Sequence, residues 1–122
     1  KNIKNIKLPV SAPFHCKLMS PATLKMEKII NEQKINDTIY RIVSNVSASE
    51  YENKEEIKKL LIKQIESPVR WRESIEYMIS KGTNTFIEIG PGKVLSGLIK
   101  RINKEVKVLN IDTVEDIQEV NI

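Results

Sequence analysis

Apolar residues recur every three or four positions in several segments of the chain, which is the spacing of one helix face. The pattern predicts helices over residues 21–30, 55–65, 68–81 and 95–102, and a short closing helix over 114–120 capped by Asp112 or Thr113. Pro21 suits a first helical turn, and Ser67-Pro68 is typical of a helix start. Gly82 is expected to end the third helix in the left-handed conformation. The apolar faces are Ala22, Met26, Ile29 and Ile30; Ile57, Leu60, Leu61 and Ile65; Trp71, Ile75, Met78 and Ile79; and Leu95, Leu98, Ile99 and Ile102.

Short segments rich in β-branched residues are predicted to be strands: Ile6–Val10, Ile39–Val43, Thr85–Ile89 and Val106–Leu109. The polar stretch 44–53 is expected to be a loop, and Gly90-Pro91-Gly92-Lys93 a tight turn. Strands that alternate with helices predict an α/β fold with a largely parallel sheet. Ligands of such sheets bind beyond the carboxyl ends of the strands. The sequence places the His15 loop, Ser44-Asn45 and the Gly90 turn at such ends.

The composition is that of one globular domain, with 122 residues, 40% hydrophobic residues and 30% charged residues. No apolar run exceeds three residues, whereas a membrane span needs about 20, so neither a membrane segment nor a secretory signal is expected. A single cysteine, Cys16, rules out an internal disulfide. One cysteine and one histidine also exclude a structural zinc site of the usual four-ligand type.

The net charge of +4 is concentrated at the start of the chain, where residues 1–34 hold seven lysines and two glutamates. Such a segment suits nucleic acid, an acidic protein or an anionic small molecule. Aromatic residues make up 5% of the chain and do not interleave with the lysines, which disfavours a nucleic-acid surface. A solvated lysine-rich face is the simplest interpretation.

The candidate chemistry begins with His15, the only histidine, in a loop between a predicted strand and a predicted helix. Such a residue is either a general base or a surface or packing histidine. Cys16 is not expected to form a catalytic pair with His15, because adjacent residues of an extended chain point opposite ways. We interpret Cys16 as a small apolar side chain. The Gly90 turn fits neither a Walker loop nor a dinucleotide fingerprint. No G-x-S-x-G nucleophile elbow is present in the chain.

Four blocks of sequence, in this order, resemble the malonyl-CoA:acyl carrier protein transacylases of fatty-acid synthesis and the related acyltransferase domains of polyketide synthases. The blocks are L-P-V-S-A-P-F-H-C-K-L-M-S-P-A, V-S-N-V, Q-I-E-S-P-V-R-W and I-E-I-G-P-G-K-V-L-S-G-L-I-K-R-I. The resemblance covers Ile6 to Ile111. It implies an acyltransferase that moves malonyl from malonyl-CoA to the acyl carrier protein by a ping-pong mechanism, in the cytoplasm and without a cofactor or metal.

The resemblance also assigns roles to residues of this chain. His15 matches the general base of the catalytic serine, and Gln64 matches the residue whose backbone carbonyl orients that imidazole. Phe14 matches a position where phenylalanine accompanies malonyl and serine accompanies methylmalonyl, since a ring leaves no room for an α-methyl branch. Asn45 and the Gly90 turn match parts of the cleft floor.

The resemblance implies that the nucleophile, in a G-H-S-L-G-E elbow, lies upstream of these blocks, together with the malonyl-binding arginine and the oxyanion hole. The chain is therefore expected to be the C-terminal part of a hydrolase-like, largely parallel α/β subdomain over 11–122. Residues 1–10 are expected to be the last strand of a ferredoxin-like small subdomain. Alone, the chain is expected to be inactive and to fold poorly, because its strands lack partners.

Two interpretations of function follow from the missing nucleophile. In the first, the chain works as part of an active transacylase together with the missing N-terminal half. In the second, it is an inactive remnant that binds the acyl carrier protein or a separate N-terminal half. No nucleic-acid or membrane partner is expected.

Overall fold

The computed structural model describes residues 11–119, which form two compact units. One unit comprises residues 11–41 and 51–69, and the other comprises residues 42–50 and 70–119. The predicted strand Ile6–Val10, and with it the expected small-subdomain segment 1–10, lies outside the described residues. Within residues 11–119, no helix is both long and apolar enough to cross a membrane.

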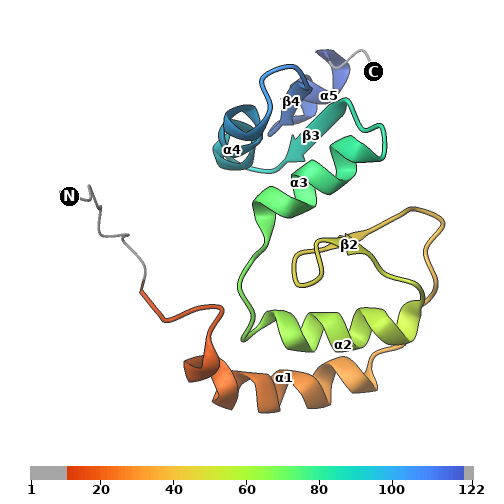
Figure 1. The fold of residues 1–122 in the computed structure, drawn as a ribbon, viewed down its shortest axis with the longest axis vertical. Helices are drawn as coiled ribbons and strands as arrows, with labels where there is room; N and C mark the ends of the chain where they lie inside the picture. Colours follow the sequence, from red (N-terminus) through yellow and green to blue (C-terminus); the bar gives the residue numbers. More distant parts are fainter. Residues whose placement is uncertain (1–10, 120–122) are drawn as a thin grey trace. The chain divides into compact units, whose positions relative to one another are not determined.

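The first unit is a pair of helices that lie side by side, preceded by a single helical turn (Figure 1). The turn η1 spans Lys17–Met19, α1 spans Ser20–Glu32 and α2 spans Lys54–Gln64. The side chain of Asn53 caps α2 by accepting a hydrogen bond from the Glu56 amide at 3.0 Å. The Lys58 ammonium donates to the Asn31 carbonyl at 2.9 Å and ties α2 to the end of α1. Both helices confirm the predictions made from their apolar stripes.

The second unit is built on two parallel strands, β3 (Thr85–Ile89) and β4 (Lys107–Ile111). Helices α3 (Trp71–Ser80) and α4 (Val94–Ile102) pack against one face of this pair, and α5 (Val114–Glu119) follows β4. The core joins one side chain of α3 to one each from β3, α4 and the segment before β4: Ile75, Phe86, Ile99 and Val106. The α/β class and a parallel sheet are therefore confirmed within the described residues.

Two sequence predictions in the middle of the chain are wrong. Residues 39–42 of the predicted strand Ile39–Val43 are not a strand. Instead, Val43–Ser44 (β1) pairs with Ser49–Glu50 (β2) as a short antiparallel hairpin, which lies mostly within the predicted loop 44–53. Ile39 is 89% exposed, so its β propensity has no neighbouring strand or core to favour it.

The predicted start of the third helix at Ser67-Pro68 is also wrong, because α3 begins at Trp71. The Arg70 amide donates to the Asn45 carbonyl of the β1–β2 turn at 3.0 Å. This hydrogen bond fixes the backbone of Arg70 to the hairpin, and the helix begins at the next residue. The predicted end is confirmed, since Gly82 has a φ of 94°.

Candidate active site

His15 lies in a turn just before η1, and its backbone is left-handed with a φ of 59°. A side chain in this region costs about 1–2 kcal/mol in general, although histidine adopts it more readily than most residues. The imidazole Nδ1 lies 3.0 Å from the backbone carbonyl oxygen of Gln64. The fold therefore brings together two of the residues expected to share a site, 49 positions apart in the chain.

The Gln64 carbonyl is available because Gln64 is the last residue of α2. The last carbonyls of a helix have no amide partner one turn further on. A carbonyl only accepts hydrogen bonds, so the contact assigns the proton to Nδ1 of His15 and leaves Nε2 as the acceptor nitrogen. The Gln64 side-chain amide donates to the Ser67 carbonyl at 3.1 Å and lies 3.4 Å from His15 Nδ1. The backbone oxygen is therefore the nearer partner of the ring.

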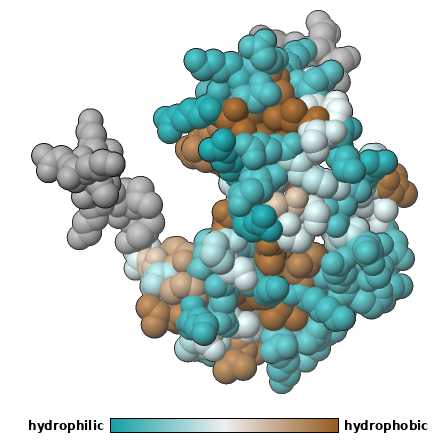
Figure 2. Space-filling view, in the orientation of Figure 1, coloured by the Kyte–Doolittle hydropathy of each residue, from teal (hydrophilic) through white to brown (hydrophobic). Residues whose placement is uncertain are grey.

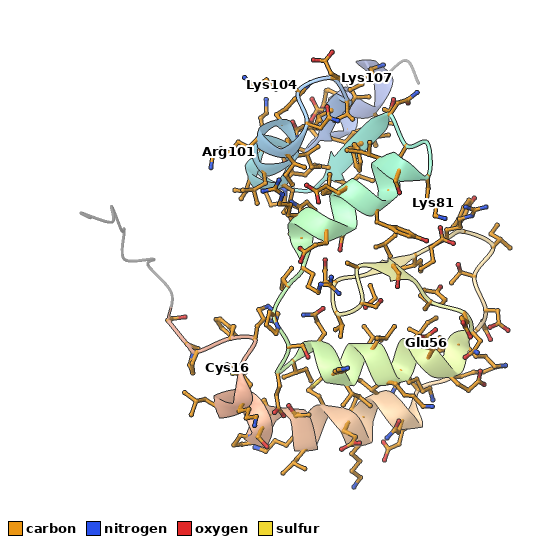
Figure 3. All side chains as sticks on the ribbon, in the orientation of Figure 1. Cys16, Glu56, Lys81, Arg101, Lys104 and Lys107 are labelled. Carbon is orange, nitrogen blue, oxygen red and sulfur yellow. The ribbon has the colours of Figure 1, made fainter. Side chains whose placement is uncertain are left out.

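The side chains on either side of His15 form no hydrogen bond with its imidazole within the described part of the chain: Cys16 bonds to the backbone and Phe14 is exposed. The Cys16 thiol, labelled in Figure 3, donates to the Pro13 carbonyl at 3.2 Å. The Phe14 side chain is 56% exposed, and its amide closes the turn by donating to the Ala12 carbonyl at 2.9 Å. An exposed imidazole next to an exposed ring is suited to proton transfer with a substrate group.

Asn45 belongs to the second unit, where it begins the turn between β1 and β2. Arg70 fastens this turn at two points, since its amide donates to the Asn45 carbonyl at 3.0 Å and its guanidinium to the Ser47 carbonyl at 3.1 Å. Ala48 completes the turn with a φ of 55°. The backbone of Asn45 is thus fixed within its unit.

The Gly90 turn is held by a carboxylate that was not among the residues predicted to form a site. Glu88 on β3 accepts hydrogen bonds from the Leu95 amide at 3.0 Å, from the Ser96 amide at 2.8 Å and from the Ser96 hydroxyl at 2.6 Å. Asn110 on β4 donates to the same carboxylate at 3.0 Å. The Ser96 hydroxyl, with these amides, holds the pKa of Glu88 below its usual value.

This carboxylate caps the first turn of α4, which explains the rigid strand–turn–helix junction. Gly90 and Gly92 take φ values of 127° and 91° within it. The sequence signal was available, because Glu88 lies two positions after Phe86 on a strand and therefore shares its inward face. A charged residue on an inward position of a strand indicates a buried hydrogen-bonding role.

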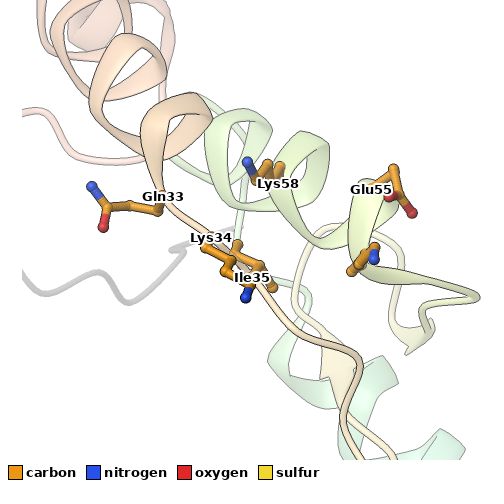
Figure 4. Close-up of a pocket in the computed structure, with 6 residues that line it drawn as sticks. Gln33, Lys34, Ile35, Glu55 and Lys58 are labelled. Atoms are coloured by element: carbon orange, nitrogen blue, oxygen red, sulfur yellow. The ribbon is translucent and has the colours of Figure 1, made fainter.

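A cavity of about 250 Å³ lies in the first unit at the other end of α2, where Lys54 begins the helix and Lys58 lies about one turn further on (Figure 4). Lys34, Gln33, Ile35 and Glu55 complete its lining. The Asp37 carboxylate accepts from the Lys54 amide at 3.2 Å. The cavity is cationic and does not include His15. In residues 11–119, no group of three or more histidine, cysteine or acidic side chains is placed to hold a metal ion.

Comparison with known proteins finds similar curated proteins, although no family model matches the chain. It is 47% identical over 113 residues to a malonyl CoA-acyl carrier protein transacylase of Bacillus subtilis, covering 93% of this chain and 36% of that protein. A protein of the same name from Staphylococcus aureus is 46% identical over 114 residues, with 93% and 37% covered.

Solved structures agree with this relationship. The crystal structure of malonyl CoA-acyl carrier protein transacylase from Clostridium perfringens matches with a TM-score of 0.86 and 46% identity, covering 93% of this chain and 36% of that one. An acyl carrier protein S-malonyltransferase from Vibrio cholerae gives a TM-score of 0.87 at 40% identity, with 93% and 37% covered. The chain therefore spans little more than a third of the length of these relatives.

Proposed function

The chain is related to the malonyl CoA-acyl carrier protein transacylases and corresponds to a portion of their length, and we propose that it supplies the general base of such an enzyme. The parent protein would transfer malonyl from malonyl-CoA to the acyl carrier protein in fatty-acid synthesis. Its catalytic serine would lie outside this chain. The observation that carries the proposal is the 3.0 Å contact between His15 Nδ1 and the Gln64 carbonyl.

In the proposed reaction, His15 Nε2 takes the proton of the serine hydroxyl as the serine oxygen attacks the thioester carbon of malonyl-CoA. The carbon–sulfur bond breaks, and the imidazolium returns its proton to the departing thiol. The second half runs in reverse: the carrier-protein thiol gives its proton to His15 and attacks the malonyl-serine ester. The serine oxygen then leaves and recovers the proton from His15.

The end of α2 supports this cycle by orienting the base. The Gln64 carbonyl keeps the proton on Nδ1, so that Nε2 is ready to accept one. Because the acceptor is a backbone atom, Gln64→Ala is expected to reduce turnover only slightly.

Phe14 and Asn45 are also proposed to have roles in the enzyme. The Phe14 ring is proposed to exclude an α-methyl branch on the acyl group, and the turn that begins at Asn45 is proposed to form part of the cleft floor. The chain would be the C-terminal part of the larger, hydrolase-like subdomain of a cytoplasmic enzyme, preceded by the end of the small ferredoxin-like subdomain at residues 1–10.

The direct test is His15→Ala in the complete polypeptide, with malonyl transfer to acyl carrier protein as the readout. Turnover is expected to fall by about 10³-fold or more, by analogy with loss of a triad member. Cys16→Ala is the matched control, because its thiol only donates to the Pro13 carbonyl, and its turnover should stay near that of the wild type. A His15→Ala enzyme with an unchanged rate would exclude His15 as the base.

The alternative function is a non-catalytic module that binds the acyl carrier protein or a separate N-terminal half. It would apply if no nucleophile elbow accompanies the present sequence, which itself holds no G-x-S-x-G motif. The intact mass of the protein in its native source separates the two. A mass well above 14.0 kDa, with a serine elbow in the added sequence, supports the enzyme, whereas a mass near 14.0 kDa supports the module.

A further inference from the structure

Arg70 lies between the β1–β2 hairpin and α3 and forms hydrogen bonds with both. Its amide donates to the Asn45 carbonyl at 3.0 Å, and Nη1 of its guanidinium donates to the Ser47 carbonyl at 3.1 Å. Its own carbonyl accepts from the Ser74 amide at 3.0 Å and from the Ser74 hydroxyl at 2.8 Å. Ser74 lies in α3 and is 2% exposed. Arg70 therefore anchors the hairpin turn to a buried residue of the helix.

The turn that Arg70 anchors has a strained backbone. Ala48 has a φ of 55° and is buried, although the left-handed region is unfavourable for an alanine. Such a conformation persists only where the surrounding contacts hold it, and strain of this kind is concentrated at functional sites. Within residues 11–119, the one other non-glycine residue with a positive φ is His15, the proposed base. The strain therefore supports a functional role for the turn.

The turn leaves the side chain of Asn45 available. Within residues 11–119, this side-chain amide forms no hydrogen bond. The neighbouring hydroxyls are used inside the hairpin, since Ser44 accepts from a turn amide at 3.1 Å and Ser47 donates to a strand carbonyl at 3.4 Å. A side-chain amide can both donate and accept hydrogen bonds. Asn45 is therefore the polar side chain of this turn that remains free to contact a substrate.

We propose that Arg70 is a positioning residue for malonyl transfer, which holds the hairpin turn so that the Asn45 side chain contacts malonyl-CoA. This inference rests on the proposed function, in which the same turn forms part of the cleft floor. Arg70 acts through the turn and does not touch the substrate itself. Loss of its guanidinium would release the Ser47 carbonyl and allow the strained backbone at Ala48 to relax. The Asn45 side chain would then shift away from the substrate.

The competing interpretation is that Arg70 is an ordinary surface arginine, because hydrophilic side chains cover much of the visible face of the second unit (Figure 2). Arg72 is such a residue, with a side chain that is 76% exposed and pairs with Glu76 on the same helix at 2.8 Å. Arg70 is less exposed, and its guanidinium lies nearer to the Ser47 carbonyl, at 3.1 Å, than to Glu73, at 3.4 Å. A charged donor bound to the backbone of another element restrains that element, whereas an exposed ion pair within one helix contributes little.

The test replaces each arginine by methionine in the complete polypeptide and measures malonyl transfer to acyl carrier protein. Arg70→Met is expected to raise the KM for malonyl-CoA by about 5-fold or more and to leave kcat within about 2-fold of the wild type, because a lost binding contact acts on KM. Arg72→Met is the matched control, since it removes the same side chain two positions further on and should leave both constants unchanged.

A double substitution tests whether Arg70 acts through Asn45. Asn45→Ala is expected to raise the KM for malonyl-CoA by about as much as Arg70→Met. In the Asn45→Ala background, Arg70→Met should raise it further by less than about 2-fold, because residues that act through one another are not additive. A purely structural role for Arg70 would multiply the two effects.

Hydrogen exchange of the complete enzyme tests whether the turn is released. The Ala48 amide donates to the Ser44 carbonyl at 2.8 Å, so this amide is protected while the turn is held. Arg70→Met should speed exchange in the segment 44–50 by about 10-fold and leave β3 and β4 unchanged. Arg72→Met should leave all three segments unchanged. A general loss of stability would instead speed exchange in β3 and β4 as well.

Several outcomes would overturn the proposal: an unchanged KM in Arg70→Met, an equal rise in Arg72→Met, full additivity with Asn45→Ala, or unchanged exchange in the segment 44–50. If Arg70→Met does not fold, Arg70→Gln is compared with Arg72→Gln by the same criteria. A complete wild-type polypeptide without malonyl transfer counts against the proposed function. An active wild type with an unchanged KM in Arg70→Met counts against the role of Arg70 alone.

Discussion

Ile75→Ala should destabilise the second unit more than any change at its surface. The Ile75 side chain is 1% exposed and packs with Phe86, Ile99 and Val106 where α3 meets the sheet. The substitution removes three buried carbon atoms, which at about 0.8 kcal/mol each gives about 2.4 kcal/mol of lost burial. The surrounding side chains come from separate elements and cannot all move inward. A residual cavity should therefore raise the loss to about 3–4 kcal/mol.

Trp71 makes this loss measurable, because it is the only tryptophan and it packs against the same core. Its indole nitrogen is buried, so unfolding of this unit exposes it to water and changes its fluorescence. At about 2 kcal/mol per molar urea, a loss of about 3 kcal/mol lowers the urea midpoint by about 1.5 M. If the complete polypeptide contains other tryptophans, its fluorescence no longer reports this unit alone. Hydrogen exchange of the β3 and β4 amides then measures the same loss of stability.

Ile117→Ala in α5 is the matched control, since Ile117 has the same side chain on a helix of the same unit but is 60% exposed. Its free energy of unfolding should stay within about 0.5 kcal/mol of the wild-type value. The reasoning fails if the two variants have the same midpoint. It also fails if Ile75→Ala unfolds with the wild-type midpoint and slope.

Three further predictions concern single side chains. Because the pKa of Glu88 is lowered in the folded chain, above all by the Ser96 hydroxyl, its contribution to stability is present above its unfolded pKa and is lost as pH falls through the folded one. Urea midpoints from about pH 7 to about pH 3 should therefore fall more steeply for the wild type than for Glu88→Gln, and parallel curves would contradict this. Asn53→Ala removes the cap of α2 and should cost the first unit about 1 kcal/mol, measured by circular dichroism, whereas a change below about 0.2 kcal/mol would show that the cap is unimportant. Phe14→Ser in the complete enzyme should shift the kcat/KM preference toward methylmalonyl-CoA by about 10-fold or more, and an unchanged ratio would remove Phe14 from the specificity site.

The helices were predictable because their signals are local. The stripe of Ile57, Leu60 and Leu61 and the β-rich run of β3 gave the right elements with boundaries within one or two residues. The segment Ile39–Val43 has equally strong β propensity, but Val43 is its only residue that lies in a strand. The difference lies in partners: β3 has β4 beside it and a core beneath it, whereas residues 39–42 have neither within the described chain. Propensity states what a segment favours, and tertiary contacts decide what it forms.

The site was less predictable from the residues alone. His15 stood out as the only histidine, but residue types gave no reason to connect it with Gln64, and the resemblance to known transacylases supplied that connection. The Glu88 network was missed because its partners are amides of α4 and an asparagine on another strand. Such contacts depend on where a helix begins and on the register of two strands, and neither quantity is visible in a hydropathy pattern.

The contact between His15 and Gln64 joins two local features that are each unfavourable alone. A left-handed backbone at His15 costs free energy, and a helix-terminal carbonyl without a donor is an unsatisfied acceptor. In the fold, the left-handed turn aims the imidazole at the Gln64 carbonyl, and the imidazole supplies the donor that this carbonyl lacks. Nothing in this arrangement requires a particular side chain at position 64, since it depends on the point where α2 stops. The orientation of the proposed base is therefore set by a helix boundary, which explains why the residue types alone do not connect these two positions.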